Sequence, residues 1–146
     1  MTIEADICVI GAGAGGLSVA AGASMLGART VLVEKGLMGG DCLNYGCVPS
    51  KALLAAGHAA EAVRGAPAFG VVAGPPRIDA ARVHAHVRDT IAAIAPNDSV
   101  ARFEGLGATV IQAPARFVGR RLIEAGETRI EARRVVIATG SVPMIP

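Results

Sequence analysis

Residues 6–16 read DICVIGAGAGG, an apolar run that stops at a string of glycines. The apolar residues 7–10 fit a strand that is buried on both faces of a parallel sheet. A helix of small residues is predicted from about Ala14 to Leu26, and a second apolar strand, residues 30–33, ends at Glu34. The stretch therefore predicts a strand, a glycine turn, a helix and a second strand, which is the βαβ unit of a parallel α/β fold.

The glycines follow the pattern G-x-G-x-x-G, with an acid about 20 residues further on, which is typical of a dinucleotide-binding turn. Gly11 permits the tight turn, Gly13 lets the backbone approach a pyrophosphate, and Gly16 lets helix and strand pack closely. The helix N-terminus attracts phosphate, and Glu34 is placed to hold ribose hydroxyls. The alternative for Glu34 is a solvated acid at a strand end, with Lys35 as its surface neighbour. The residues predicted to bind the nucleotide are Gly11, Gly13, Ala14, Gly15, Gly16, Glu34 and Lys35.

A second unusual stretch, residues 39–51, reads GGDCLNYGCVPSK. Cys42 and Cys47 stand five positions apart, and a regular helix separates such positions by about 7.5 Å of rise alone. A disulfide needs Cα atoms roughly 4.4–6.8 Å apart, so the pair can bridge only if the backbone between them is irregular. Gly46 and Asn44 tolerate the backbone angles that such a bend uses.

Pro49 suits the first turn of a helix, and strong helix formers follow it, which predicts a helix from about Pro49 to Val63. Cys47 then lies near a helix N-terminus, where partial positive charge and the ammonium group of Lys51 lower the pKa of a nearby thiol. An activated thiol is what disulfide exchange requires. By spacing alone, the pair fits equally well a structural disulfide or two unpaired core cysteines. The surrounding glycines, Pro49 and Lys51 favour a redox-active dithiol.

These thirteen residues resemble the redox motif of the pyridine nucleotide-disulfide oxidoreductases, the flavoprotein family of dihydrolipoyl dehydrogenase, mercuric reductase and glutathione reductase. The resemblance implies a Rossmann-like FAD-binding domain with a central parallel sheet, a small antiparallel β-meander and flanking helices. It implies that Cys47 is the sulfur next to the flavin and forms the charge-transfer thiolate. Cys42 is then the interchange sulfur that meets substrate, and Lys51 lies close to the isoalloxazine. The ending Pro49-Ser50-Lys51 is more similar to the dihydrolipoyl dehydrogenase and mercuric reductase branches than to glutathione reductase.

The end of the chain carries a further resemblance. Residues 135–138 read as a buried strand that ends in Thr139-Gly140-Ser141, similar to the family's Ala-Thr-Gly element at the FAD, although such a turn can simply end a strand. The same resemblance places the backbone of Ala113 against the adenine. Asp41 and Tyr45 depart from the residues usual in the family, which leaves the substrate open. The FAD contacts that the resemblance implies are Gly40, Asp41, Cys42, Cys47, Lys51, Ala113, Ala138, Thr139 and Gly140.

The rest of the chain predicts helices and short strands. Asp79 is the expected N-cap of a helix that runs to Ala95 and has an apolar face. Pro96 stops that helix, and Asn97 or Asp98 is expected to cap a shorter one that ends near Glu104. A third parallel strand is predicted at residues 109–112, and an antiparallel meander at residues 115–118, 122–125 and 128–131.

Composition argues against several classes of function. The 146 residues make one modest domain, and a net charge of +2 without a basic run or aromatic ladder argues against nucleic-acid binding. Three cysteines are too few for a secreted disulfide scaffold, which favours a reducing cytoplasm, one catalytic pair, and Cys8 as a buried core thiol. Residues 7–28 carry no charge, but their glycines, and Glu4 and Asp6 ahead of them, argue against a membrane span or signal peptide. We interpret His58, His84 and His86 as surface or packing residues and predict no metal site.

The resemblance covers residues 1–146 but only the first, FAD-binding part of such an enzyme. By this resemblance the NAD(P)-binding and dimerisation domains are expected to lie outside this chain, so no general acid or base is assigned and the isolated chain is not expected to complete turnover. The complete enzyme is expected to be a homodimer that passes electrons between NAD(P)H, FAD, the Cys42–Cys47 pair and a lipoamide-like disulfide. The alternatives are a mercuric reductase-like enzyme that acts on Hg(II), and a non-catalytic module whose two thiols hold a soft metal ion.

Overall fold

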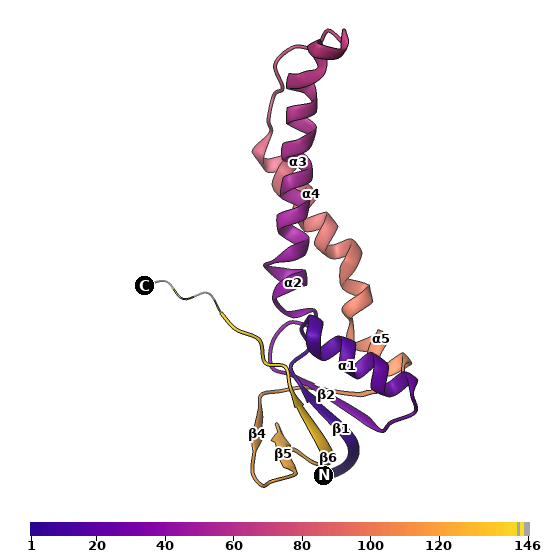
Figure 1. Ribbon diagram of the computed structural model, residues 1–146. Coiled ribbons are helices and arrows are strands. Elements are labelled where there is room, and N and C mark those ends of the chain that lie inside the picture. The colour runs from indigo at the N-terminus through magenta and orange to yellow at the C-terminus, as the bar shows by residue number, and fades with distance from the viewer. Residues whose placement is uncertain (143, 145–146) are drawn as a thin grey trace.

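The computed structural model describes residues 1–142 and 144, and its centre is a six-stranded sheet in the order β3-β2-β1-β6-β5-β4 (Figure 1). The strands are β1 (Thr2–Ile10), β2 (Thr30–Glu34), β3 (Thr109–Gln112), β4 (Ala115–Phe117), β5 (Leu122–Ala125) and β6 (Thr128–Ile137). β3, β2, β1 and β6 are parallel to one another, whereas β6, β5 and β4 pair antiparallel. The predicted α/β class with flanking helices is confirmed, and the parallel part and the meander form one mixed sheet.

β6 joins two segments that the sequence predicted separately. Residues 128–131 were expected in the meander and residues 135–138 in a separate buried strand, but a single strand runs from Thr128 to Ile137. It pairs antiparallel with β5 at its start and parallel with β1 along its length. Ile130 and Ala132 face the core, whereas Ile137 is 67% exposed, so the expectation of a fully buried end is wrong for Ile137.

One face of the sheet is covered by α1 (Ala14–Met25) and α5 (Val100–Gly105). Leu17 of α1 and Phe103 of α5 are buried in one cluster with Val9 and Leu32 of the sheet. Burying a side chain such as Phe103 contributes roughly 1.5–3 kcal/mol. These contacts hold the first helix, and therefore the glycine turn at its N-terminus, firmly on the parallel strands.

On the opposite face, the sheet curls back over itself and so covers its own side chains. β3 and β4 form the two edges of the sheet, yet only residues 113 and 114 join them. A two-residue link spans at most about 3.6 Å per residue, so the sheet must curl until its edges approach each other. Ile123 of β5 is consequently fully buried in one cluster with Cys8 and Val33. The curl brings the loop between β3 and β4 close to the ends of the parallel strands.

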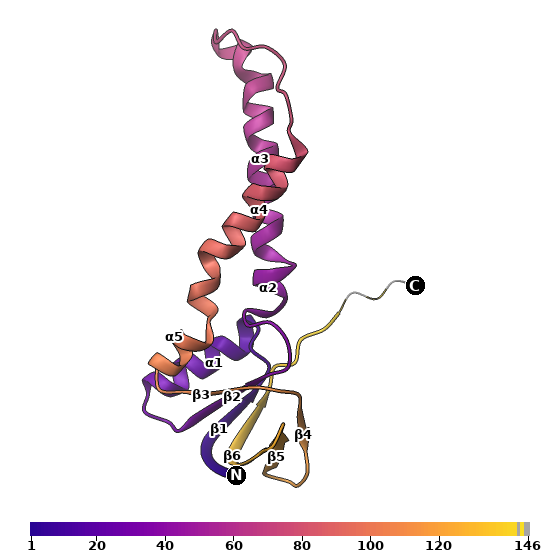
Figure 2. The same ribbon diagram turned by 180° about the vertical axis from the view of Figure 1, so that it is seen from behind.

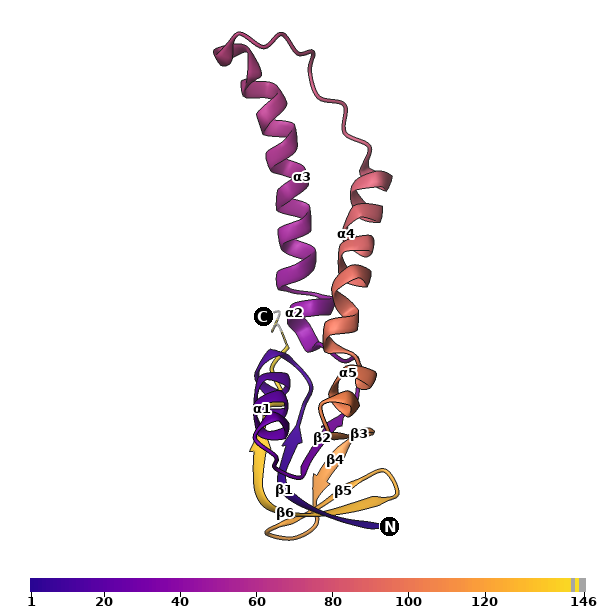
Figure 3. The ribbon, with the colours of Figure 1, turned by 90° about the vertical axis from the view of Figure 1, so that its right-hand side faces the viewer.

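Helices form an arm that projects from the sheet (Figures 1 and 2). They are α2 (Gly40–Asn44), α3 (Cys47–Gly65), η1 (Ala66–Phe69), α4 (Ala80–Ile94) and η2 (Ala95–Asp98). α3 and α4 pack against each other as a hairpin, which Figure 3 shows from the side. The predicted α3, from Pro49 to Val63, was two residues short at each end. The predicted apolar face of α4 is half-buried and consists of Val83, Val87, Ile91 and Ile94.

The observed N-caps of α4 and α5 can be compared with the residues predicted for them. Asp79 caps α4 as predicted, because its carboxylate accepts a hydrogen bond from the backbone N–H of Arg82 at 3.1 Å. The prediction that Asn97 or Asp98 caps the next helix is wrong. Ser99 is the cap of α5 and accepts from the backbone N–H of Arg102 at 3.2 Å, while both predicted residues lie in η2.

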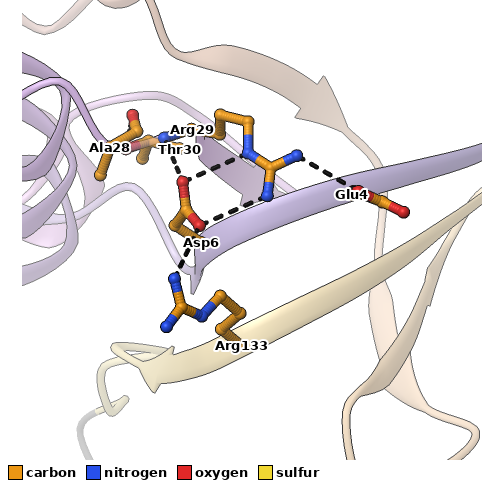
Figure 4. A network of polar contacts seen from close by, with 6 residues as sticks. All are labelled: Glu4, Asp6, Ala28, Arg29, Thr30 and Arg133. Carbon is orange, nitrogen blue, oxygen red and sulfur yellow. Dashed lines mark hydrogen bonds and ion pairs between the residues drawn. The ribbon is translucent and has the colours of Figure 1, made fainter.

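A charged network holds the amino end of β2 to β1 and β6 (Figure 4). The backbone N–H and the guanidinium of Arg29 donate to Asp6 at 3.0 and 3.2 Å, and Arg29 also contacts Glu4 at 3.2 Å. Arg133 of β6 reaches Asp6 at 3.5 Å. The hydrogen bonds from Arg29 lower the pKa of Asp6 to about 2. This network lies on the strands far from their carboxyl ends, where the candidate site is found.

Candidate functional site

A pocket of about 530 Å³ opens where β1, β2 and β6 end. Carboxyl ends of neighbouring parallel strands meet at one edge of the sheet, which is where open α/β sheets bind ligands. The pocket is lined by Ile10, Gly11, Gly13, Val33, Glu34, Lys35, Gly40, Asp41, Ala113, Pro114, Ala115, Ala138, Thr139, Gly140 and Ser141. Most of this lining is backbone or small side chains, so a ligand can approach the main chain closely.

The glycine turn leaves no room for side chains at two positions. Gly11 has φ +106°, and a Cβ there would lie 2.2 Å from the carbonyl oxygen of Ala138. A Cβ on Gly16 would lie 1.8 Å from the carbonyl oxygen of Gly11. Gly13 differs, because a Cβ there would meet only the Cα of Gly40, at 3.8 Å. Gly11 and Gly16 are thus required by chain packing, whereas Gly13 keeps open space on the pocket side.

The first turn of α1 offers backbone donors to that space. The first intrahelical bond of α1 runs from Leu17 N–H to the carbonyl oxygen of Gly13 at 2.9 Å. Gly13, the N-cap, has no side chain to accept from the N–H groups ahead of Leu17. Those free N–H groups and the helix dipole favour an anion. Ala14 and Gly15 are exposed at this end of the helix.

Glu34, at the end of β2, stabilises the glycine turn through hydrogen bonds. Its carboxylate accepts from the backbone N–H of Ala12 at 2.5 Å and from that of Gly36 at 2.7 Å. A carboxylate has about four lone-pair sites, so two hydrogen bonds leave capacity for a ligand hydroxyl. The acid therefore ties β2 to the glycine turn, a role that its spacing in the sequence did not reveal. Its predicted ribose contact stays a prediction.

The segment that carries the thiols is attached directly to the glycine turn. Gly39 N–H donates to the carbonyl oxygen of Ala12 at 2.9 Å. Gly40 has φ +57°, and a Cβ there would lie 2.6 Å from the Cα of Gly13. This approach of two glycine backbones brings Gly40 and Asp41 into the pocket lining. Cys42 follows immediately, so the dithiol lies beside the mouth of the turn.

The bend between the cysteines separates two helices. Cys42 is in α2 and Cys47 is the first residue of α3, and the carbonyl oxygen of Asp41 accepts from the N–H groups of Tyr45 and Gly46 at 2.8 and 2.6 Å. The predicted irregular backbone is confirmed. A Cβ on Gly46 would lie 2.7 Å from Asp41 Oδ2 and 3.1 Å from the carbonyl oxygen of Asp41, so a larger residue there must displace the Asp41 side chain.

Asn44 acts differently from the prediction. Positive φ angles within residues 1–142 and 144 occur only at glycines, so Asn44 does not provide an unusual backbone conformation. Its side-chain amide instead donates to the carbonyl oxygens of Met38 and Gly40 at 3.1 and 2.8 Å. Asn44 therefore stabilises the turn through its side chain.

Both thiols are free. The neighbouring Cys47 thiol is the first cause of a raised pKa at Cys42, and partial burial is the second. Cys47 is exposed and Cys42 half-buried. Lys51 is exposed on α3, four positions after Cys47 and hence on the same helix face.

Ten of the predicted cofactor residues line the pocket: Gly11, Gly13, Glu34, Lys35, Gly40, Asp41, Ala113, Ala138, Thr139 and Gly140. The other predicted residues lie outside its lining and are Ala14, Gly15, Gly16, Cys42, Cys47 and Lys51. The prediction missed the lining residues Ile10, Val33, Pro114, Ala115 and Ser141. Ile10, Val33, Pro114 and Ser141 adjoin predicted residues, whereas Ala115 is the first residue of β4 and enters because the sheet curls.

The remaining cysteine and the histidines lie apart from the pocket. Cys8 is fully buried, and burial raises the pKa of its thiol to about 11, which leaves it unreactive. The three histidines, His58, His84 and His86, are exposed. Among residues 1–142 and 144, no three His, Cys, Asp or Glu side chains come together as a metal site.

Within residues 1–142 and 144, no helix combines the length and apolar character that crossing a bilayer requires.

The chain is similar to known proteins over nearly its whole length, not only at the motifs. A family model described as pyridine nucleotide-disulphide oxidoreductase matches residues 5–146. A mercuric reductase of Bacillus cereus is 31% identical over 141 residues, which are 97% of this chain and 22% of that protein. A dihydrolipoyl dehydrogenase of Thermus scotoductus is 37% identical over 139 residues, which are 95% of this chain and 30% of that protein. The dihydrolipoyl dehydrogenase of Bacillus subtilis is 34% identical over 146 residues, with coverage of 97% and 31%. The chain thus spans less than a third of the length of these relatives.

Proposed function

This chain belongs to the pyridine nucleotide-disulphide oxidoreductase family, and from that premise we propose that it is the FAD-binding, dithiol-bearing part of a dihydrolipoyl dehydrogenase-like flavoprotein. One observation supports this most directly. The segment with Cys42 is joined to the glycine turn through the Gly39–Ala12 hydrogen bond and the Gly13–Gly40 approach. A single ligand in the pocket can therefore contact the nucleotide turn and lie near the dithiol.

The residues present fit FAD. The pyrophosphate would be held by the free N–H groups at the start of α1, against which Gly13 leaves space. Glu34 retains lone pairs for the adenosine ribose, and Ala113 lies in the same pocket for the adenine. Thr139 and Gly140 line the pocket at the end of β6. When bound, the flavin would supply the electron and hydride transfer that amino-acid side chains do not provide.

The chain's own part in the reaction is thiol chemistry. The reduced pair attacks a substrate disulfide, one substrate S–S bond breaks, and a mixed disulfide forms through the sulfur of Cys42. Attack by Cys47 then forms the Cys42–Cys47 bond and releases the second substrate thiol, so that two electrons and two protons pass to the substrate. The reverse direction oxidises a dithiol. Lys51, on the same face of α3 as Cys47, is proposed to lie close to the bound flavin.

The names of the relatives suggest two substrates, a dihydrolipoyl group and Hg(II). We favour the dihydrolipoyl group for this chain, because two adjacent thiols complete disulfide exchange by themselves. Hg(II) also binds two thiolates, so a mercuric reductase-like activity is the second candidate. NAD(P)H as electron donor, a homodimer and a cytoplasmic location complete the proposal for the whole enzyme.

The test for the cofactor site uses two matched glycine variants. Gly13→Ala adds a methyl group that the chain accommodates but that stands in the pocket, whereas Gly22→Ala adds one on α1 with no atom within 4 Å. Titration of FAD against the purified chain is expected to show binding that Gly13→Ala weakens by at least about tenfold and Gly22→Ala leaves unchanged. A wild-type chain that takes up no FAD, or equal binding by both variants, contradicts the proposal.

The test for the dithiol is a reductive titration of the FAD-loaded chain. We expect uptake of about four electrons per chain, two by the flavin and two by the disulfide. Cys47→Ser should reduce this to about two electrons, and Cys8→Ser should leave it at about four. The loaded, oxidised chain is then offered dihydrolipoamide, and the reduced chain Hg(II), to decide between the two substrates.

A further inference from the structure

Asp98 is an acid near the dithiol that neither the family resemblance nor the sequence motifs assign. It ends η2, at the foot of the arm, and is half-buried. Its Oδ2 lies 3.1 Å from where a Cβ on Gly39 would be. Gly39 is the N-cap of α2, and Cys42 stands three positions later in that helix. The carboxylate of Asp98 therefore lies at the amino end of α2, the helix that contains Cys42.

The charge of Asp98 is not neutralised by a partner in residues 1–142 and 144. It forms no ion pair there and accepts no hydrogen bond. Arg102, four positions further on, donates instead to the carbonyl oxygen of Asn97 at 2.6 Å. The negative charge of Asp98 is also among the causes that raise the pKa of Cys42, after the neighbouring Cys47 thiol and partial burial.

The other charges around Cys42 are few. Asp41 adjoins it in α2 and is exposed, and Lys51 on α3 is also exposed. α1, which packs against α2, contains no charged residue. α4, which also packs against α2, carries its charged side chains exposed to solvent, namely Arg82, His84, His86, Arg88 and Asp89. Asp98 is thus half-buried, whereas Asp41 and Lys51 are exposed to solvent.

We propose that Asp98 determines which disulfides react with the reduced pair, by favouring cationic and neutral disulfides over anionic ones at Cys42. The inference rests on the proposed dithiol function. In the reaction, the pair is oxidised to the Cys42–Cys47 disulfide and one substrate disulfide is reduced to two thiols, with two electrons and two protons transferred. A fixed negative charge beside the attacked bond raises the local concentration of cations and lowers that of anions.

The experiment measures oxidation rates of the reduced chain with three disulfides. They are cystamine, which is cationic, glutathione disulfide, which is anionic, and hydroxyethyl disulfide, which is neutral and serves as reference. Peptide masses report formation of the Cys42–Cys47 bond. Asp98→Asn is expected to lower the ratio of the cystamine rate to the glutathione disulfide rate by roughly threefold or more. Because every variant is tested with the same disulfides, the change in this rate ratio between variants does not depend on the intrinsic reactivity of each disulfide.

Asp89→Asn is the matched control, because it removes the same charge from exposed α4 and should leave the ratio unchanged. Asp98→Glu retains the charge and should retain the preference. An Asp98→Asn ratio equal to that of the wild type overturns the inference. If Asp98→Asn does not fold, the wild-type ratio must fall as salt rises from about 0.01 to about 1 M, and a constant ratio overturns the inference. Failure of hydroxyethyl disulfide to oxidise the wild-type pair would instead contradict the proposed dithiol function.

Discussion

The sheet with its glycine turn and the helical arm use glycine in opposite ways. A Cβ on Gly11 or Gly16 would come within 1.8–2.2 Å of backbone atoms, and one on Gly40, where the arm meets the turn, within 2.6 Å of Gly13. Gly57 and Gly65 of α3 have nothing within 4 Å of the corresponding position. The same contrast holds for burial, because α3 buries only Ala52 whereas whole clusters are buried on the sheet. The sheet side is therefore fixed by packing, and the arm is tolerant of change except where it meets the turn.

The largest expected difference between the two regions concerns burial. Phe103→Ala removes a ring that is 1% exposed beneath the sheet and is expected to cost about 3–5 kcal/mol of unfolding free energy. Leu54→Ala, on α3, removes a side chain that is 59% exposed and should change stability by less than about 0.5 kcal/mol. Urea denaturation curves of the two variants measure both values. Similar losses would mean that the arm contributes to the same core as the sheet.

The second difference concerns glycine itself. Gly40→Ala forces a positive φ on alanine and a contact of 2.6 Å with Gly13, which we expect to cost about 2–3 kcal/mol. Gly57→Ala meets no atom within 4 Å and should stabilise α3 by about 0.5–1 kcal/mol. Thermal unfolding of the two variants gives both changes. A Gly40→Ala protein as stable as the wild type would contradict the close attachment of the dithiol segment to the turn.

A third, smaller effect is confined to the arm. Asp79→Ala removes the N-cap of α4 and is expected to destabilise that helix by about 1 kcal/mol. Hydrogen exchange of the α4 amides should accelerate by about fivefold, while the amides of β1 keep their protection. Asp89→Ala, in the middle of the same helix, is the control and should leave exchange nearly unchanged. Equal acceleration in β1 would mean that arm and sheet unfold together.

The sequence predicted what local patterns determine. The roles of Gly11 and Gly16 follow from the strand-turn-helix spacing, and Asp79 is a cap by its own position. The continuity of β6 was missed because Glu131, Arg133 and Arg134 interrupt its apolar pattern. In the structure these three side chains are exposed, while Ile130 and Ala132, on either side of Glu131, face the core.

Features that depend on contacts between distant parts of the chain could not be predicted from the sequence. Ala115 reaches the pocket because the sheet edges meet, and no local pattern reports that closure. The Gly13–Gly40 approach joins residues 27 positions apart, so the sequence showed two motifs without showing that they touch. Asn97 or Asp98 was predicted as a cap, and the position of Asp98 beside Gly39, at the start of α2, appears only in the structure.

The smallest expected effect is a pH dependence of stability at the amino end of the sheet, where Asp6 lies. Asp6 has its pKa lowered from 3.8 to about 2, first by the hydrogen bonds from Arg29. A carboxylate with a depressed pKa stabilises the folded chain above its unfolded pKa, and this contribution is lost as pH falls through the folded value. The stability difference between wild type and Asp6→Asn should therefore be constant above about pH 4 and should shrink between about pH 4 and pH 2. Urea midpoints measured across that range test the expectation, with Glu61→Gln as control, because that substitution removes an exposed ion pair on the arm at Arg64. A difference between wild type and Asp6→Asn that does not change with pH would show that the network of Arg29 contributes nothing through charge, and that strand pairing and apolar packing fix the strands on which the glycine turn depends.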